Sequence, residues 1–159
     1  MSLDFPLENL LSRPLIAHLS TISAAGPRDS PLWFLWEDGV MWFVGRTVDT
    51  FPKRIRETAQ CAVGVVDFDL QRGTLRHVGM RGTAEVTALD MARLRRLLAR
   101  YIGEDPTCWR STFRREVVDK LDLMVRFRPT SIVARDQSYF SSASPREFGE
   151  HLIHPQEGD

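Results

Sequence analysis

The chain has 159 residues, and its 21 basic and 21 acidic side chains give a formal net charge of zero. Its hydrophobic fraction of 43% and charged fraction of 26% are typical of one globular domain with a sizeable core. The balanced charge argues against a dedicated nucleic-acid binder, and no apolar run reaches the length of a membrane span.

Neither the start of the chain nor its cysteines point to secretion. Residues 1–5 lack the basic region and the long apolar core of a signal peptide. Cys61 and Cys108 form no Cys-x-x-Cys or Cys/His spacing, so we expect free thiols in a cytoplasmic protein, with Cys61 in a strand core. The four histidines are scattered, and no metal site is predicted.

The first half of the chain has the pattern of short strands separated by turns. Residues 5–11 predict a short helix and residues 14–23 a strand. Residues 30–36 and 40–44 are rich in β-formers and flank Glu37-Asp38-Gly39, which is typical of a tight hairpin. This hairpin contains three of the four tryptophans.

A long strand and one clear helix follow. Residues 61–68 predict a buried strand, and residues 74–87 a longer one that Gly79 and Gly82 interrupt. Glycines at such positions indicate a bulge, a bend or the close approach of another backbone or ligand. Residues 91–101 carry apolar side chains at helical spacing.

The end of the chain predicts a further short helix at 113–121 and alternating strands at 123–128 and 131–135, with Pro129 as a break. We expect residues 1–140 to form one domain and residues 141–159 a tail, either loose or with a short docked helix. The predicted fold is mainly β (α+β), with six or seven strands in an antiparallel barrel and a few peripheral helices.

A basic segment lies where the strand ending at Val44 gives way to a helix that contains Pro52. Pro is tolerated in the first turn of a helix. The free N–H groups of a helix start, together with basic side chains, form an anion site that most often binds phosphate. The alternative is a capped surface helix with solvated charges. The polar side chains of this junction are Arg46, Thr47, Thr50, Lys53 and Arg54.

The aromatic hairpin comes directly before this junction. Trp33 and Phe34 would offer an apolar wall next to an anion anchor, the combination that flavin mononucleotide (FMN) requires. Packing in the core is the alternative for the tryptophans, and it should hold for at least one of them.

Five segments together resemble the pyridoxamine 5'-phosphate oxidase-like proteins, the FMN-binding split β-barrel superfamily. The similarity extends over about residues 6–136 and rests on the order and spacing of these segments. They are Ser30-Pro31-Leu32-Trp33-Phe34, Trp42-Phe43-Val44-Gly45-Arg46-Thr47, Lys53-Arg54-Ile55, Cys61-Ala62-Val63-Gly64-Val65-Val66-Asp67 and Val78-Gly79-Met80-Arg81-Gly82-Thr83-Ala84.

The resemblance implies a split barrel and a homodimer with FMN at the subunit interface. It implies that the isoalloxazine ring lies along Pro31, Leu32 and Trp33, and that the partner subunit closes the site through Trp109 or the region of Arg81. It assigns the phosphate and ribityl chain to Arg46, Thr47, Thr50 and Lys53.

The resemblance also implies an FMN-dependent oxidoreductase that acts on a small molecule. Residues 135–140 do not match the substrate segment of true pyridoxamine phosphate oxidases, so that specific activity is not expected. Three alternatives remain: a flavin-binding module without turnover, a deazaflavin-dependent reductase that uses the same groove, and a purely structural dimer. No catalytic acid or base is predicted, because the flavin would carry the hydride or electrons.

Overall fold

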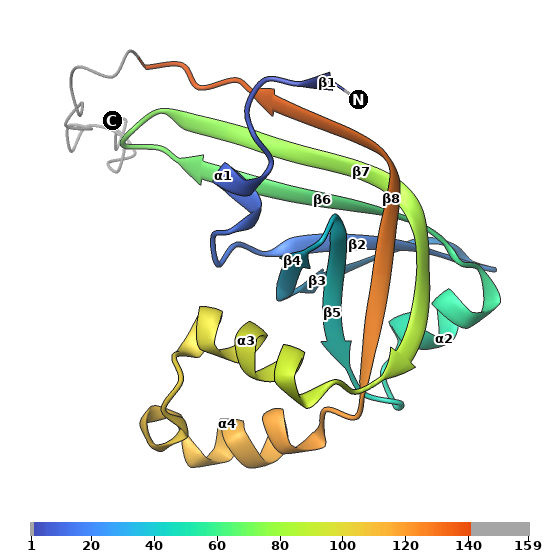
Figure 1. Cartoon of the computed structure of the whole chain (residues 1–159). Helices are drawn as coiled ribbons and strands as arrows, with labels where there is room; N and C mark the ends of the chain where they lie inside the picture. Colours follow the sequence, from blue (N-terminus) through green and yellow to red (C-terminus); the bar gives the residue numbers. More distant parts are fainter. Residues whose placement is uncertain (1, 141–159) are drawn as a thin grey trace, which may run out of the picture.

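The computed structural model describes residues 2–140, which fold around one antiparallel sheet (Figure 1). The predicted tail at 141–159, either loose or with a short docked helix, lies outside the described residues. The strands are β1 (Ser2–Leu3), β2 (Ala17–Ser23), β3 (Gly26–Leu32), β4 (Phe34–Glu37), β5 (Val40–Gly45), β6 (Gln60–Asp69), β7 (Thr74–Ala88) and β8 (Leu123–Asp136). The helices are α1 (Glu8–Leu11), α2 (Thr50–Glu57), α3 (Met91–Ile102) and α4 (Ser111–Glu116), with 3-10 turns η1 (Pro106–Cys108) and η2 (Val118–Lys120).

The sheet has eight strands, and seven of them follow the order β3-β2-β6-β7-β8-β5-β4. All pairs along this path are antiparallel, and β1 adds a short parallel pair with β8. The two ends of the path, β3 and β4, are consecutive in the chain and are separated only by Trp33. The described strand pairing leaves the sheet open between them, so closure into a barrel stays a prediction.

The predicted strand 30–36 is two strands, and this difference accounts for part of the extra strand count. β3 begins at Gly26, because Ser23 pairs with Gly26 across a two-residue turn and Gly26 adopts φ +103°. β3 lies at an edge of the sheet, where the missing N–H groups of Pro27 and Pro31 are tolerated.

The predicted break at Pro129 is wrong, because β8 runs through it as one strand. Pro129 pairs with Gly82 at an irregularity in the β7–β8 register. A Cβ on Gly82 would lie 2.8 Å from the Pro129 Cα and closer still to the Arg128 carbonyl oxygen. Both the predicted bulge and the predicted backbone approach are therefore confirmed at Gly82, and the bulge tolerates proline. β7 and β8 bend together along their length (Figure 1).

The core lies on the concave side of the bent sheet. Strand residues of alternating parity, with α1 and α2 against them, bury their side chains in one cluster. Cys61 belongs to this cluster, as predicted, and burial raises the pKa of its thiol to about 11. The largest fully buried side chains of the cluster include Phe34, Phe43, Phe127, Leu10, Leu11, Leu19 and Met41.

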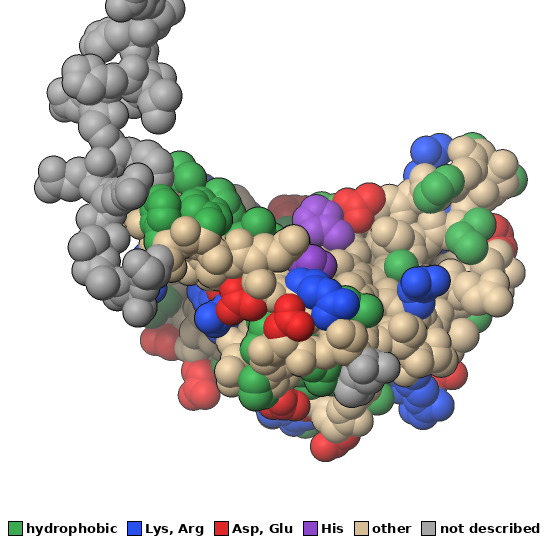
Figure 2. Space-filling view, turned by 90° about the horizontal axis from the view of Figure 1, so that it is seen from above, with side chains coloured by type: hydrophobic (Ala, Val, Ile, Leu, Met, Phe, Trp, Pro, Cys, Tyr) green, Lys and Arg blue, Asp and Glu red, His purple; other side chains and the backbone are tan. Residues whose placement is uncertain are grey.

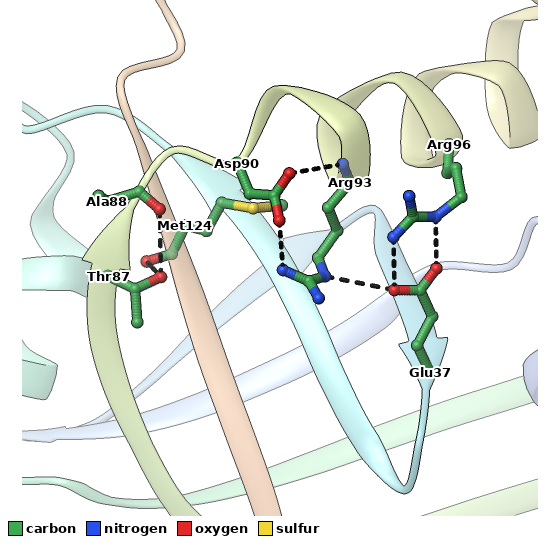
Figure 3. Close-up of polar contacts among 7 residues, drawn as sticks. All are labelled: Glu37, Thr87, Ala88, Asp90, Arg93, Arg96 and Met124. Carbon is green, nitrogen blue, oxygen red and sulfur yellow. Dashed lines mark hydrogen bonds and ion pairs between the residues drawn. The ribbon is translucent and has the colours of Figure 1, made fainter.

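Helix α3 is anchored to the β4–β5 hairpin by charged groups (Figure 3). Glu37 accepts hydrogen bonds from Arg96 at 2.6 and 2.9 Å and from Arg93 at 3.2 Å. The hydrogen bond from Arg96 is the main reason that the pKa of Glu37 is lowered. Asp90 caps the helix by accepting the Arg93 N–H, and Arg93 also lies 3.8 Å above the Trp42 ring. The hairpin itself has the predicted tight turn, with Asp38 and Gly39 both at positive φ.

Candidate functional site

The basic junction lies between β5 and α2, as predicted, and Pro52 falls in the first turn of the helix. Asp49 bonds Arg46 at three points: its carboxylate accepts the Arg46 backbone N–H at 2.9 Å and guanidinium hydrogen bonds at 2.7 and 3.0 Å. The hydrogen bond to Asp49 raises the pKa of Arg46, so this arginine stays charged but already has an anionic partner.

The remaining predicted anion ligands lie around the start of α2. Thr47 donates its backbone N–H to Asp122 at 2.7 Å. Thr50 is the first residue of α2, and both it and Lys53 are exposed. Among residues 2–140, Lys53 has no ion-pair partner, so its charge is available to a ligand.

A third cation, Arg54 of α2, contacts β2 and β3 at the edge of the sheet. Its Nε donates to the Thr21 hydroxyl at 2.7 Å, and an Nη donates to the Ser30 hydroxyl at 3.4 Å. Thr21 is only 1% exposed and Arg54 is half-buried. No carboxylate pairs with Arg54 among the described residues, which is unusual for a partly buried charge. We call Thr21, Ser30 and Arg54 the Arg54 cluster.

The chemistry of the Arg54 cluster fits a phosphate group. A guanidinium has five N–H donors in a planar fork that matches phosphate geometry, and the hydroxyls of Thr21 and Ser30 hold this fork in place. Leu32 follows Ser30 on the same face of β3, two residues and about 7 Å along the strand.

A cavity of about 630 Å³ lies between Trp33 and the segment from α3 to α4. We call it the aromatic cavity. Trp33 stacks on Tyr101 with ring centroids 4.8 Å apart and planes 5° apart. Tyr101 is held in turn, because its hydroxyl donates to the Leu15 carbonyl at 2.6 Å and accepts the Phe34 N–H at 3.1 Å. Six residues that line the cavity are Trp33, Ile102, Cys108, Trp109, Arg110 and Phe113.

The residues predicted to lie near the flavin ring are found in two parts of the structure. Trp33 and Trp109 of the same chain line the aromatic cavity, so their proximity requires no second subunit. Leu32 lies on β3 next to the Arg54 cluster, and Pro31 is exposed on the same edge strand. Arg46, Thr47, Thr50 and Lys53 lie together at the β5–α2 junction.

Two members of the Arg54 cluster, Thr21 and Ser30, were not predicted as site residues. Arg54 belongs to the predicted basic junction, but the amino-acid pattern does not indicate that its side chain reaches β2 and β3. The signal that could have found Ser30 is the pairing of β2 with β3, in which Leu19 lies opposite Ser30 and Thr21 opposite Arg28. That pairing depends on a strand that starts at Gly26, whereas the predicted strand starts at residue 30.

Over residues 2–140, the structure has no helix long and apolar enough to cross a membrane. The same residues contain no group of three or more His, Cys, Asp or Glu side chains arranged to hold a metal ion.

No family model and no curated protein matches the chain. Among solved structures, it is similar to an F420 reductase at 26% identity, covering 82% of this chain and 98% of that one with a TM-score of 0.64. It is also similar to a conserved hypothetical protein from Mycobacterium tuberculosis (20% identity, 82% of each chain, TM-score 0.65). An FAD-binding protein from Mesorhizobium loti is 15% identical over 80% of this chain and 88% of that one, with a TM-score of 0.54. The chain therefore has a fold that it shares with proteins named for F420 and for FAD.

Proposed function

We propose that this protein binds a flavin-type nucleotide and uses it to reduce or oxidise a small molecule. The observation that carries the proposal is Arg54, a half-buried cation held by the hydroxyls of Thr21 and Ser30 and facing no carboxylate of residues 2–140. A partly buried charge without a counterion is best explained by an anionic ligand.

In this proposal Arg54 and Lys53 hold the phosphate, and the ring extends along β3 past Leu32 toward Trp33. The hydroxyls of Thr21 and Ser30 orient the Arg54 guanidinium. Arg46 stabilises the loop before α2 through Asp49 and contributes positive potential rather than a free donor. The bound ring supplies hydride or electron transfer, and the protein supplies position and charge.

The cofactor is either FMN, as the family resemblance implies, or a deazaflavin. The similarity to an F420 reductase at 26% identity over nearly its whole length favours the deazaflavin. The two cofactors share a flat tricyclic ring and a phosphate, and the Arg54 cluster would serve both.

We also propose that two chains associate through the outer face of β2, β6 and β7. Four large apolar side chains are 42–58% exposed there, a density that favours association. Gly64 pairs with Gly79 across β6 and β7, and neither would meet an atom within 4 Å if it had a Cβ, which leaves the face flat. Figure 2 shows hydrophobic side chains gathered near one end of the molecule and histidine side chains nearer the middle of the view. The four apolar side chains are Ile16, Ile22, Val66 and Phe68.

The test is a titration of purified protein with FMN and with F420, followed by tryptophan fluorescence and melting temperature. Arg54→Gln should weaken the binding of the preferred cofactor at least tenfold, because a charge-assisted phosphate contact is lost. Arg56→Gln, on the same helix but exposed, is the matched control and should bind normally. If neither cofactor binds wild-type protein, the proposal fails.

Turnover and assembly need separate measurements. Reduction of the bound cofactor by a nicotinamide donor would separate an oxidoreductase from a module that only binds. Light scattering should report a dimer that Val66→Lys converts to a monomer, because the new charge would be buried in the interface. A wild-type monomer at high protein concentration would contradict the proposed interface.

A further inference from the structure

The aromatic cavity has the size and lining of a small-molecule site. Its volume of about 630 Å³ falls in the range of ligand pockets, and its lining includes the three aromatic side chains of Trp33, Trp109 and Phe113. Neither the Arg54 cluster nor the β5–α2 junction contributes a side chain to its lining, so the proposed phosphate site does not account for it.

The rings of the cavity are held in fixed orientations. Tyr101 covers one face of Trp33 in a parallel stack, and Phe113 lies 6.1 Å from Trp33 at 49°. The Trp109 indole donates to the Ile102 carbonyl at 2.9 Å, which fixes that ring at the end of α3. Rings fixed in this way favour a flat aromatic guest, because stacking costs little further side-chain entropy.

The charge at the cavity is positive. Arg110 lines it and has no ion-pair partner among residues 2–140. Glu116, the acidic residue of the lining, is already paired with Lys120. A ligand that carries an acidic group would therefore gain an attraction at Arg110 without repulsion from an unpaired carboxylate.

We propose that the aromatic cavity binds a planar aromatic acid, and that this is the chemical class of the small-molecule substrate. The second part rests on the proposed function, because the proposed cofactor ring extends along β3 toward Trp33 and would meet a ligand of the cavity there. The first part concerns this chain alone and holds with or without a cofactor.

Cys108 makes the proposal testable inside the cavity itself. It lines the cavity and is exposed, whereas Cys61 is buried. Alkylation of native protein by iodoacetamide should therefore modify Cys108 selectively, and mass spectrometry can follow its rate. Any ligand that fills the cavity should slow this reaction.

Three probes separate the features of the ligand: 2-naphthoate, its neutral analogue 2-naphthamide, and the non-aromatic acid cyclohexanecarboxylate. We expect saturating 2-naphthoate to slow alkylation of Cys108 at least fivefold, 2-naphthamide to need a several-fold higher concentration, and cyclohexanecarboxylate to have no effect. Equal protection by the acid and the amide, or protection by the cyclohexane acid, would overturn the proposal.

Variants then localise the effect. Arg110→Gln should raise the half-protective concentration of 2-naphthoate about three- to fivefold and leave that of 2-naphthamide unchanged, as expected for an exposed ion pair. Phe113→Leu should weaken both aromatic probes, whereas Tyr139→Leu, at an exposed aromatic outside the cavity lining, should weaken neither. Unchanged protection in both Arg110→Gln and Phe113→Leu would refute the site.

The same assay separates this inference from the proposed cofactor site. FMN or F420 at a concentration that saturates the tryptophan signal should leave protection by 2-naphthoate intact. If the cofactor instead protects Cys108 and competes with 2-naphthoate, the cavity is the cofactor site and the substrate assignment is overturned. If no cofactor binds but 2-naphthoate still protects Cys108, the proposed function fails while the aromatic-acid site stands.

Discussion

At Gly82 the backbone of the neighbouring strand lies so close that a residue with a side chain should destabilise the fold. In Gly82→Ala the new methyl group would lie 2.8 Å from the Pro129 Cα and closer to the Arg128 carbonyl oxygen. Both obstacles are backbone atoms of β8, so no side chain can move aside. The two strands must separate locally at the bulge that shapes the sheet.

The expected loss can be worked out from two opposing contributions. Overpacking against rigid neighbours costs about 1–3 kcal/mol, and a backbone obstacle belongs at the upper end of that range. Replacing glycine by alanine in a strand stabilises the folded state by roughly 0.5–1 kcal/mol, because the unfolded chain then has lower entropy. The net loss of about 2 kcal/mol should lower the melting temperature by about 4–8 °C in a chain of this size.

Gly79→Ala is the matched control, three residues earlier on the same strand. A Cβ at Gly79 would have no atom within 4 Å, so this variant should melt at the wild-type temperature or slightly above it. Both variants should be melted at one protein concentration, low enough to keep the chain monomeric because Gly79 lies on the face proposed for association, with circular dichroism as the readout. Equal melting temperatures for Gly82→Ala and Gly79→Ala would refute the close approach of β7 and β8.

Three further predictions follow from single contacts. Glu37→Gln should cost about 1 kcal/mol at pH 7; because Arg96 lowers the pKa of Glu37, this difference should shrink as the pH falls below about 4.5 toward the folded-state pKa. Tyr101→Phe should cost about 1–3 kcal/mol in urea unfolding, since a carbonyl and an N–H lose their partner. At pH 8, a thiol reagent should modify one cysteine in native protein and two in denatured protein, because burial raises the pKa of Cys61 to about 11.

Each of these predictions has an outcome that would contradict it. A stability difference for Glu37→Gln that is constant from pH 7 to pH 3 would exclude the ion pair with α3. Tyr139→Phe, at an exposed hydroxyl, should be neutral, and a loss equal to that of Tyr101→Phe would show that buried hydrogen bonds are not the cause. Two reactive thiols in native protein would show that Cys61 is not buried.

Local patterns were sufficient where one segment determines its own structure. The Asp38-Gly39 turn was predictable because type I′ geometry needs positive φ at both central residues, and both residues adopt it. Helix α3 was predictable from its apolar stripe and from Gly103, which adopts φ 80° at its end. Burial of Cys61 followed from its place in an apolar strand.

Patterns failed where the structure depends on two distant segments. Pro129 has the local signature of a strand break, but it lies opposite Gly82, and that pairing absorbs the irregularity. In the candidate site, the sequence shows Arg54 in the basic junction, but the hydroxyl partners of Arg54 are 33 and 24 residues earlier. The Asp49 carboxylate at i+3 from Arg46 was visible in the sequence, yet its competition with a ligand became clear only from the hydrogen bonds.

The passage of the chain through Trp33 has a mechanical consequence. β3 and β4 are the two ends of the strand path, and one residue joins them. The last residue of β3 and the first residue of β4 are therefore each one peptide bond away from Trp33. The Trp33 side chain also forms a wall of the aromatic cavity. An insertion at this point would therefore lengthen the link between the two sheet ends and displace a wall of the aromatic cavity at the same time.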